Sequence, residues 1–302
     1  MSDFSRKNLF GRISSAEQLV LMRRTVTDDG CGIRLIEVNN GSGLSYTIYP
    51  ERNMSIGECF VRGIGIVPRC GKIPDIYTGL FASAELAGYE FTELAGIEPF
   101  CGWRGESYVM EISGEIIHRA ADGKMLHRHR TISTAMGKNI LTIEERVGNP
   151  GGKDADFPCG FSINFSWPMI NESVWLATAE HRITPLNEAA VSGMKDWCRI
   201  PEPQKDFAEE FFHHDLPMDR DGMAKIMLIN PELKLAVSVK FAKAALPHLF
   251  QCKQMQENKY MLNLLPGNSL PPSLHCTSDF SAPVLVPGES TGYKVIISFE
   301  EL

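Results

Sequence analysis

Residues 159–166 of the chain read CGFSINFS, a strict alternation of apolar and small polar side chains. This alternation predicts a β-strand, because successive side chains of a strand point to opposite faces of its sheet. The apolar set is expected to face the core and consists of Cys159, Phe161, Ile163 and Phe165. The other set is Gly160, Ser162, Asn164 and Ser166. Small polar side chains of this kind suit either a solvated face or a hydroxyl-rich ligand.

Similar short runs, rich in β-branched and aromatic residues, recur along the chain between turn signals such as Asn40-Gly41 and Asp122-Gly123. We expect strands at residues 32–38, 44–49, 59–67, 108–117, 139–147, 159–165, 225–229, 235–241, 260–265 and 293–299. About ten short strands at this spacing favour an all-β, antiparallel sandwich over βαβ units. No internal repeat is visible, so we expect a single domain over residues 1–302.

Few segments read as helices. Residues 81–95 predict a short helix or a loop, and residues 203–212 predict one or two helical turns. Residues 178–207 contain three prolines and predict a long excursion over one face of the sheet. Long loops in compact domains are often functional lids.

The composition excludes several classes of protein. The chain has 302 residues, a net charge of −7 and no basic stripe, which argues against a nucleic-acid partner. No apolar run is long enough to span a membrane, and no signal peptide is visible. The cysteines are scattered and are expected to be reduced and buried in a cytoplasmic protein. They are Cys31, Cys59, Cys70, Cys101, Cys159, Cys198, Cys252 and Cys276.

Two histidine motifs could carry chemistry. His127 and His129 share one face of an expected strand and could form half of a metal site, although an exposed basic face is the simpler interpretation. In His213-His214-Asp215, the first and third residues would share a face while His214 takes the other. A histidine beside a carboxylate could position a proton donor, or the two could be a structural pair.

Two further groups suit the binding of a sugar. Gln251 and Lys253 share one face of an expected strand and could contact a carboxylate, a phosphate or hydroxyl groups. The stretch Gly102–Glu106 combines Trp103, Arg104 and Glu106, which could stack on a sugar ring and bind its hydroxyls, although a simple turn gives the same pattern. No P-loop, GxGxxG, GxSxG or HExxH motif occurs, and the sequence indicates no cofactor.

The C-terminal block resembles the signature of the DUF4432 family, which belongs to the aldose 1-epimerase (galactose mutarotase-like) superfamily. The resemblance rests on residues 246–255 (LPHLFQCKQM), 260–265 and Pro266-Gly267-Asn268. It extends to residues 52–57, 62–63, 162–168, 212–216, 221–222, 228–231 and 286–290. It implies a β-supersandwich with a sugar cleft on a concave sheet.

The chain departs from the catalytic pattern that the resemblance implies. Mutarotation needs a base at the anomeric hydroxyl and an acid at the ring oxygen, and relatives supply a glutamate and histidines for these steps. At the matching positions this chain has Leu265, Ser162 and Arg104. None of these side chains can shuttle a proton near pH 7 by itself, so ordinary mutarotase activity should be nearly lost.

We therefore expect a protein that binds, or acts on, a monosaccharide or a sugar derivative and that could form a homodimer. The expected acid–base residues are His214, Asp215 and Glu106. The expected binding residues are Arg52, Trp103, Arg104, Ser162, Asn164, Gln251, Lys253, Asn263 and Asn268. The alternatives are a non-catalytic sugar-binding module and a metal-dependent, cupin-like sugar isomerase that uses His127 and His129.

Overall fold

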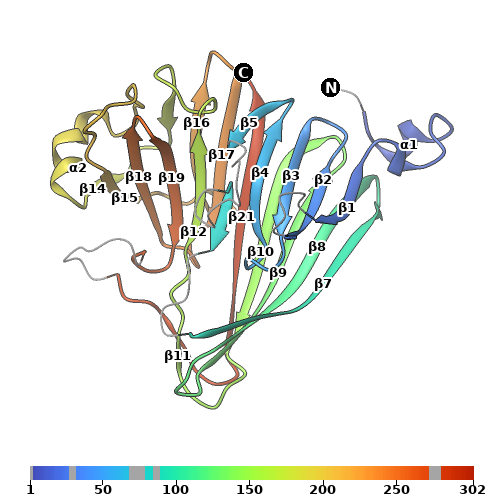
Figure 1. Cartoon of the computed structure of the whole chain (residues 1–302), viewed down its shortest axis with the longest axis horizontal. Helices are drawn as coiled ribbons and strands as arrows, with labels where there is room; N and C mark the ends of the chain where they lie inside the picture. Colours follow the sequence, from blue (N-terminus) through green and yellow to red (C-terminus); the bar gives the residue numbers. More distant parts are fainter. Residues whose placement is uncertain (1–2, 27–31, 68–78, 84–88, 272–279) are drawn as a thin grey trace.

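The computed structural model describes residues 3–26, 32–67, 79–83, 89–271 and 280–302. Most of these residues lie in two large antiparallel sheets, which we call sheet A and sheet B (Figure 1). The apolar side chains between the two sheets form one continuous core. The predicted all-β, antiparallel sandwich is therefore confirmed.

Sheet A contains the strand predicted at residues 159–165. Its strands lie in the order β1, β2, β3, β4, β6, β12, β19, β18, β15 and β14, and β5 pairs with β4. Their bounds are β1 Leu21–Val26, β2 Arg34–Asn39, β3 Leu44–Tyr49, β4 Ser55–Val61, β5 Ile64–Val67, β6 Phe81–Ser83, β12 Phe161–Ser166, β14 Arg182–Pro185, β15 Glu210–Asp215, β18 His248–Gln256 and β19 Lys259–Gly267.

Sheet B has the strand order β13, β16, β17, β21, β10, β9, β8 and β7. Their bounds are β7 Phe91–Arg104, β8 Ser107–Arg119, β9 Met125–Ala135, β10 Lys138–Gly148, β13 Trp175–Ala177, β16 Met223–Asn230, β17 Leu235–Ala242 and β21 Ser290–Glu301. A small third sheet pairs β11 (Ala155–Asp156) with β20 (Val284–Leu285). The helical segments are α1 (Arg6–Leu9), α2 (Glu188–Gly193) and the 3-10 turns η1 (Ala16–Gln18) and η2 (Met194–Asp196).

The structure corrects three local predictions. The segment 59–67 is not one strand, because a turn at Arg62 and Gly63, both with positive φ, folds it into β4 and β5. The segment 81–95 is not helical where it is described, because it contains β6 and the start of β7. The segment 203–212 forms no helix, and its end is the start of β15.

The described cysteines are all free thiols. Cys59, Cys159 and Cys252 are buried as expected, and Cys198 is half-buried. Cys101 is exposed on the edge strand β7, so the expectation of burial is wrong for this residue. Cys31, Cys70 and Cys276 lie outside the described residues. Among the described residues, no helix is both long and apolar enough to span a bilayer.

The apolar core encloses a group of charges. Arg128 and Arg130 of β9 point inward and share the carboxylate of Glu145 on β10, with all three side chains at 2% exposure or less. Nε of Arg128 lies 3.0 Å from Oε1 of Glu145, and Nε of Arg130 lies 2.7 Å from Oε2. The two guanidiniums hold the pKa of the Glu145 carboxyl below its usual value, although burial acts in the opposite direction.

Arg130 connects this buried cluster to sheet A. It donates hydrogen bonds to the backbone carbonyl of Asn53, in the turn between β3 and β4, and to the hydroxyl of Ser83 at the end of β6. Its guanidinium also lies 5.4 Å from the ring centre of Phe81 and 5.8 Å from that of Phe161. The buried cluster therefore fixes β9 and β10 against the part of sheet A that contains β4, β6 and β12.

Replacing Glu145 with Gln should destabilise the protein strongly, because both buried guanidiniums lose their counter-charge. We expect the free energy of unfolding to fall by about 3–5 kcal/mol. The matched control is Glu144→Gln at the neighbouring position, where the exposed carboxylate pairs with Lys294. Its effect should stay below about 1 kcal/mol. Urea unfolding of both variants measures the difference, and equal losses would contradict a stabilising role for the cluster.

Candidate functional site

The two faces of sheet A are assigned by the strand register. Phe161, Ile163 and Phe165 of β12 are buried in the core, so this side is the core face. Ser162 and Asn164 point the other way, onto a side that we call the outer face. Asn164 pairs with Asn263 of β19, so Asn263 also belongs to the outer face. The predicted alternation along this strand is confirmed.

Ser162, Asn164 and Asn263 form a connected polar triad on the outer face. The carboxamide oxygen of Asn164 accepts a hydrogen bond from Ser162 Oγ at 2.6 Å and another from Asn263 Nδ2 at 2.5 Å. Its Nδ2 donates to the carbonyl of Gly79 at 2.5 Å. Asn164 is fully buried, Asn263 is 7% exposed and Ser162 is half-buried. The triad is therefore held in place before any ligand arrives.

Arg52 and Tyr49 lie at the β3–β4 turn. Tyr49 pairs with Ser55, whose neighbour Ile56 faces the core, so Tyr49 and Ser55 lie on the outer face. The guanidinium of Arg52 lies 5.6 Å from the centre of the Tyr49 ring. Gly57 is required here, since any Cβ at that position would collide with this ring. The structure thus brings Arg52 to the same face as the triad.

A pair of imidazoles lies farther along the outer face. His213 of β15 pairs in register with Phe250 of β18, and His248 lies two residues before Phe250 on the same face. Nε2 of His213 lies 3.1 Å from Nδ1 of His248. The ring of Phe280 contacts both imidazoles, with ring centres 5.0 Å and 4.9 Å away. We call these four residues the imidazole cluster.

The imidazole pair is neutral at pH 7. Burial lowers the pKa of His213 to about 4, and the nearby His248 acts in the same direction. Burial also lowers the pKa of His248, with Lys243 as the next cause. A neutral imidazole has one N–H donor and one lone pair, so each ring can give or take a proton. Leu265 of β19 separates this pair from Ser162, since it pairs with Phe250.

Three predicted site residues lie on the opposite face. Gln251 pairs with Leu264, and Lys253 pairs with Leu262, both of which belong to the core. His214 lies beside Gln251, whose Oε1 is 2.8 Å from His214 Nε2. His214, Gln251 and Lys253 therefore lie on the core face, away from Ser162 and Asn164. The expectation that they share one site with the triad is wrong.

These core-face residues anchor the excursion that contains α2 and η2. Lys253 donates to the backbone carbonyls of Asp196 at 3.0 Å and Arg199 at 3.3 Å, and its Nζ lies 2.7 Å from Glu210 Oε2. Gln251 donates to the carbonyl of Trp197 at 2.8 Å. The predicted excursion over a sheet face is present in this segment, but it lies on the core side. Burial lowers the pKa of His214 to about 3, so this imidazole is neutral.

Asp215 and Asn268 also have partners inside the protein. The Asp215 carboxylate is exposed and pairs with Lys243 at 2.9 Å, and this hydrogen bond lowers the pKa of Asp215. Asn268 is buried, accepts the backbone N–H of Cys159 at 2.6 Å and donates to the carbonyl of Phe157 at 3.0 Å. Asn268 thus joins the ends of β12 and β19.

Trp103, Arg104 and Glu106 lie on the hairpin between β7 and β8. Glu106 accepts the backbone N–H groups of Arg6 and Lys7, which begin α1. Arg104 makes two hydrogen bonds to the carboxylate of Glu111. Figure 1 shows α1 at the opposite end of the molecule from β18 and β19. The structure therefore separates these three residues from the triad and the imidazole cluster.

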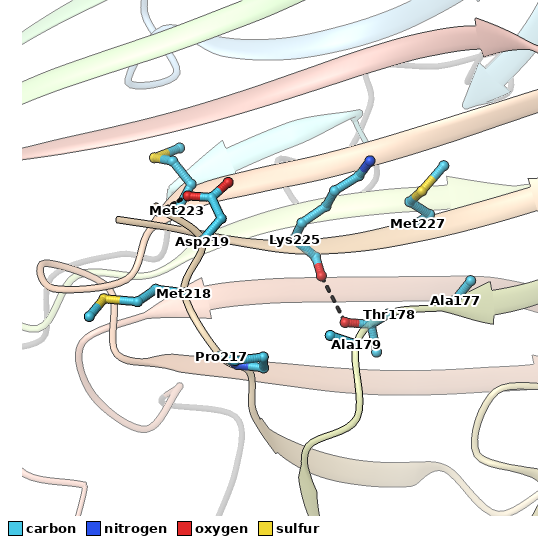
Figure 2. A pocket seen from close by; sticks show the side chains of 9 residues that line it. All are labelled: Ala177, Thr178, Ala179, Pro217, Met218, Asp219, Met223, Lys225 and Met227. Atoms are coloured by element: carbon cyan, nitrogen blue, oxygen red, sulfur yellow. Dashed lines mark hydrogen bonds between the residues drawn. The ribbon is translucent and has the colours of Figure 1, made fainter. Parts of the chain in front are cut away.

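His127 and His129 lie on the outer side of sheet B, because Arg128 between them faces the core. Nε2 of His127 lies 3.4 Å from a carboxylate oxygen of Glu115. Among the described residues, no cluster of three or more metal-ligating side chains includes them. Sheet B also carries cavities on this side, of about 420, 320 and 300 Å³. The largest of these three, at the β13 edge of the sheet, is shown in Figure 2.

Sequence reasoning missed the imidazole cluster, and in particular His248 and Phe280. Strand parity alone placed His213 and Asp215 opposite His214, and this prediction is confirmed. The wrong face of β18 was expected to be functional, since Gln251 and Lys253 are polar residues of this strand that face the core. Both faces of β18 are largely buried, so polarity along this strand does not identify the open side.

Comparisons with known proteins agree with this fold. A family model described as "Domain of unknown function (DUF4432)" matches residues 97–299. A candidate aldose 1-epimerase of Klebsiella pneumoniae has a TM-score of 0.76 at 17% identity, and the match covers 92% of this chain and 83% of the other. No curated protein matches the sequence.

Two further solved structures share the fold at low identity. The galactose 1-epimerase of Lactobacillus acidophilus has a TM-score of 0.60 at 13% identity, with 93% of this chain and 98% of the other covered. A galactose mutarotase-like protein of Clostridium acetobutylicum has a TM-score of 0.63 at 11% identity, with 94% and 100% covered.

Replacing Lys253 with Ala should destabilise the protein, because Glu210 loses its buried counter-charge and two backbone carbonyls lose their donor. We expect the free energy of unfolding to fall by about 2–4 kcal/mol. Lys259→Ala is the matched control, because this more exposed lysine on the adjacent strand pairs with Glu209. Its loss should be below about 1 kcal/mol. A Lys253→Ala variant that unfolds like the control would show that Lys253 does not anchor the excursion.

The stability of the protein should fall as the pH is lowered from about 6.5, the ordinary pKa of histidine. Burial lowers the pKa of both His118 and His214 to about 3 in the folded protein. Between these pKa values the unfolded chain binds more protons than the folded one, so acid favours unfolding. Urea unfolding at several pH values measures this slope, which should be smaller in His118→Gln. An unchanged slope in that variant would contradict the assignment.

Proposed function

The chain belongs to the DUF4432 family, and on this premise we propose that the outer face of sheet A binds a monosaccharide or a sugar derivative. The observation that carries the proposal is the polar triad of Ser162, Asn164 and Asn263. A sugar offers several hydroxyl groups, each both a donor and an acceptor, and amides and hydroxyls match this chemistry. Binding costs less when such groups are already oriented.

The hydrogen bonds within the triad support this role. The carboxamide of Asn164 is hydrogen-bonded to Ser162, Asn263 and Gly79, so Asn164 holds the other two side chains of the triad in position. Ser162 and Asn263 each donate one hydrogen bond to Asn164, and the lone pairs on their own oxygen atoms can accept hydrogen bonds from sugar hydroxyls. Arg52 beside Tyr49 adds a charged donor and an aromatic ring at one flank. The likeness to a galactose 1-epimerase and to a galactose mutarotase-like protein favours the sugar class.

For proton transfer on a bound sugar, we propose His213 and His248 in place of His214, Asp215 and Glu106. Opening a sugar ring removes the proton of the anomeric hydroxyl, breaks the bond between the anomeric carbon and the ring oxygen, and places a proton on that oxygen. Two adjacent neutral imidazoles can provide one lone pair and one N–H for these transfers. Strands lie about 4.8 Å apart, so Ser162 and His213 are roughly 14 Å apart across the sheet. A ligand over the half-buried Leu265 would lie between them, since Phe280 packs against Phe250.

A non-catalytic sugar-binding protein is the second candidate. Leu265 occupies the centre of the outer face, between the triad and the imidazole cluster, where the resemblance implies a glutamate. An apolar side chain can pack against a sugar but cannot transfer a proton. This observation favours retained binding without turnover.

Replacing Asn263 with Ala should weaken sugar binding by about tenfold or more, or about 1.4 kcal/mol, because one hydrogen bond to the ligand is lost. A panel of aldoses and ketoses, titrated by calorimetry or by ligand-observed NMR, measures the affinity. Ser133→Ala on β9 of sheet B is the control and should bind like the unmodified protein. Equal binding by Asn263→Ala, or no binding of any sugar in the panel, would contradict the proposed face.

Turnover separates the two candidate functions. The exchange between the α and β forms of any sugar that binds can be followed by NMR. A rate above background that is lost in His213→Gln, with His129→Gln on sheet B unchanged, would support the enzyme. Binding without any rate above background would support the non-catalytic protein.

A further inference from the structure

The β13 edge of sheet B carries a cavity of about 420 Å³ that the proposed sugar site does not use (Figure 2). Small side chains line one side of it: Ala177 of β13, Thr178 and Ala179 directly after it, and Pro217 after β15. Met223, Lys225 and Met227 of β16 line the other side, and Met218 and Asp219 complete the wall. A volume of this size is within the range of small-molecule sites, about 300–1,000 Å³.

The chemistry of this lining suits an alkyl chain better than a sugar. Its lining residues include three methionines and no aromatic ring or carboxamide. Methionine side chains are flexible and polarisable, and they adapt to apolar ligands of irregular shape. A sugar is usually recognised by an aromatic ring and by planar hydrogen-bonding groups, which this cavity does not offer.

Lys225 adds a positive charge to this apolar cavity. It is half-buried between Met223 and Met227, and its side chain extends toward Met227 in Figure 2. It also pairs in register with Lys240 of β17, so two ammonium groups share one face on adjacent strands. Like charges placed opposite each other destabilise a sheet. Within the described ranges, neither ammonium group has an ion-pair or hydrogen-bond partner.

Asp219 is the acidic residue of the lining, but its carboxylate is used within its own turn. Its Oδ1 accepts the backbone N–H groups of Asp221 and Met223, both at 2.9 Å. Figure 2 shows Asp219 beside Met223, while Lys225 extends toward Met227. A ligand carboxylate on the Met227 side would therefore meet Lys225 rather than Asp219.

We infer that this cavity binds a small amphipathic carboxylate, with its alkyl chain against the methionines and its carboxylate on Lys225. The ligand would supply the negative charge that the Lys225–Lys240 pair lacks and would cover half-buried apolar side chains. This site lies on sheet B, so it is independent of the sugar site proposed on sheet A. Octanoate is the probe.

Octanoate binding can be read at the methionines themselves. In protein labelled with ¹³C at the methionine methyl groups, octanoate should shift the signals of Met218, Met223 and Met227. The chain has 13 methionines, so the remaining ones are internal controls. Lys225→Gln should weaken binding at least tenfold, whereas Lys138→Gln on β10 should leave it unchanged.

Two further probes test the parts of the ligand. The neutral 1-octanol should bind at least tenfold more weakly than octanoate, because it lacks the charge for Lys225. Acetate should cause no saturating shift, because it lacks the chain. Equal binding of octanol and octanoate, shifts spread over all methionines, or no shift with octanoate would each overturn the inference.

Discussion

The buried ion cluster of Arg128, Glu145 and Arg130 is the constraint on which the rest of the molecule depends. Two guanidiniums and one carboxylate buried in an apolar core are stable only when nearly every polar atom has a partner. Arg130 meets this need with the carbonyl of Asn53 and the hydroxyl of Ser83. These partners lie on the β3–β4 turn and on β6, so the electrostatics of the core fix the turn that carries Arg52 and the strand that pairs with β12.

The strand β12 shows what the sequence can predict. Its alternation of apolar and small polar residues identifies both the strand and its two faces, because one side is wholly apolar. The same reasoning fails on β18, where Gln251 and Lys253 are polar yet face the core. Their charges and amides are satisfied by Glu210 and by backbone carbonyls of the segment 196–199. Partners so distant in the sequence leave no local pattern.

The hairpin between β7 and β8 shows a second limit of the same kind. Trp103, Arg104 and Glu106 have the residue types of a sugar site, and nothing local distinguishes that use from a structural one. Their partners are decided by which strands pair and by where α1 packs. The family resemblance predicted the sheet architecture correctly, because it rests on motifs spread over the chain rather than on one stretch.

The anchoring of the excursion has an evolutionary consequence. Lys253 contacts Asp196 and Arg199 through their backbone carbonyls, and any amino acid supplies the same oxygen atom. Natural variation at positions 196 and 199 should thus be tolerated, whereas Lys253, which donates to the two carbonyls, should vary little. Selection would then act on one side of this contact and leave the other side free to drift.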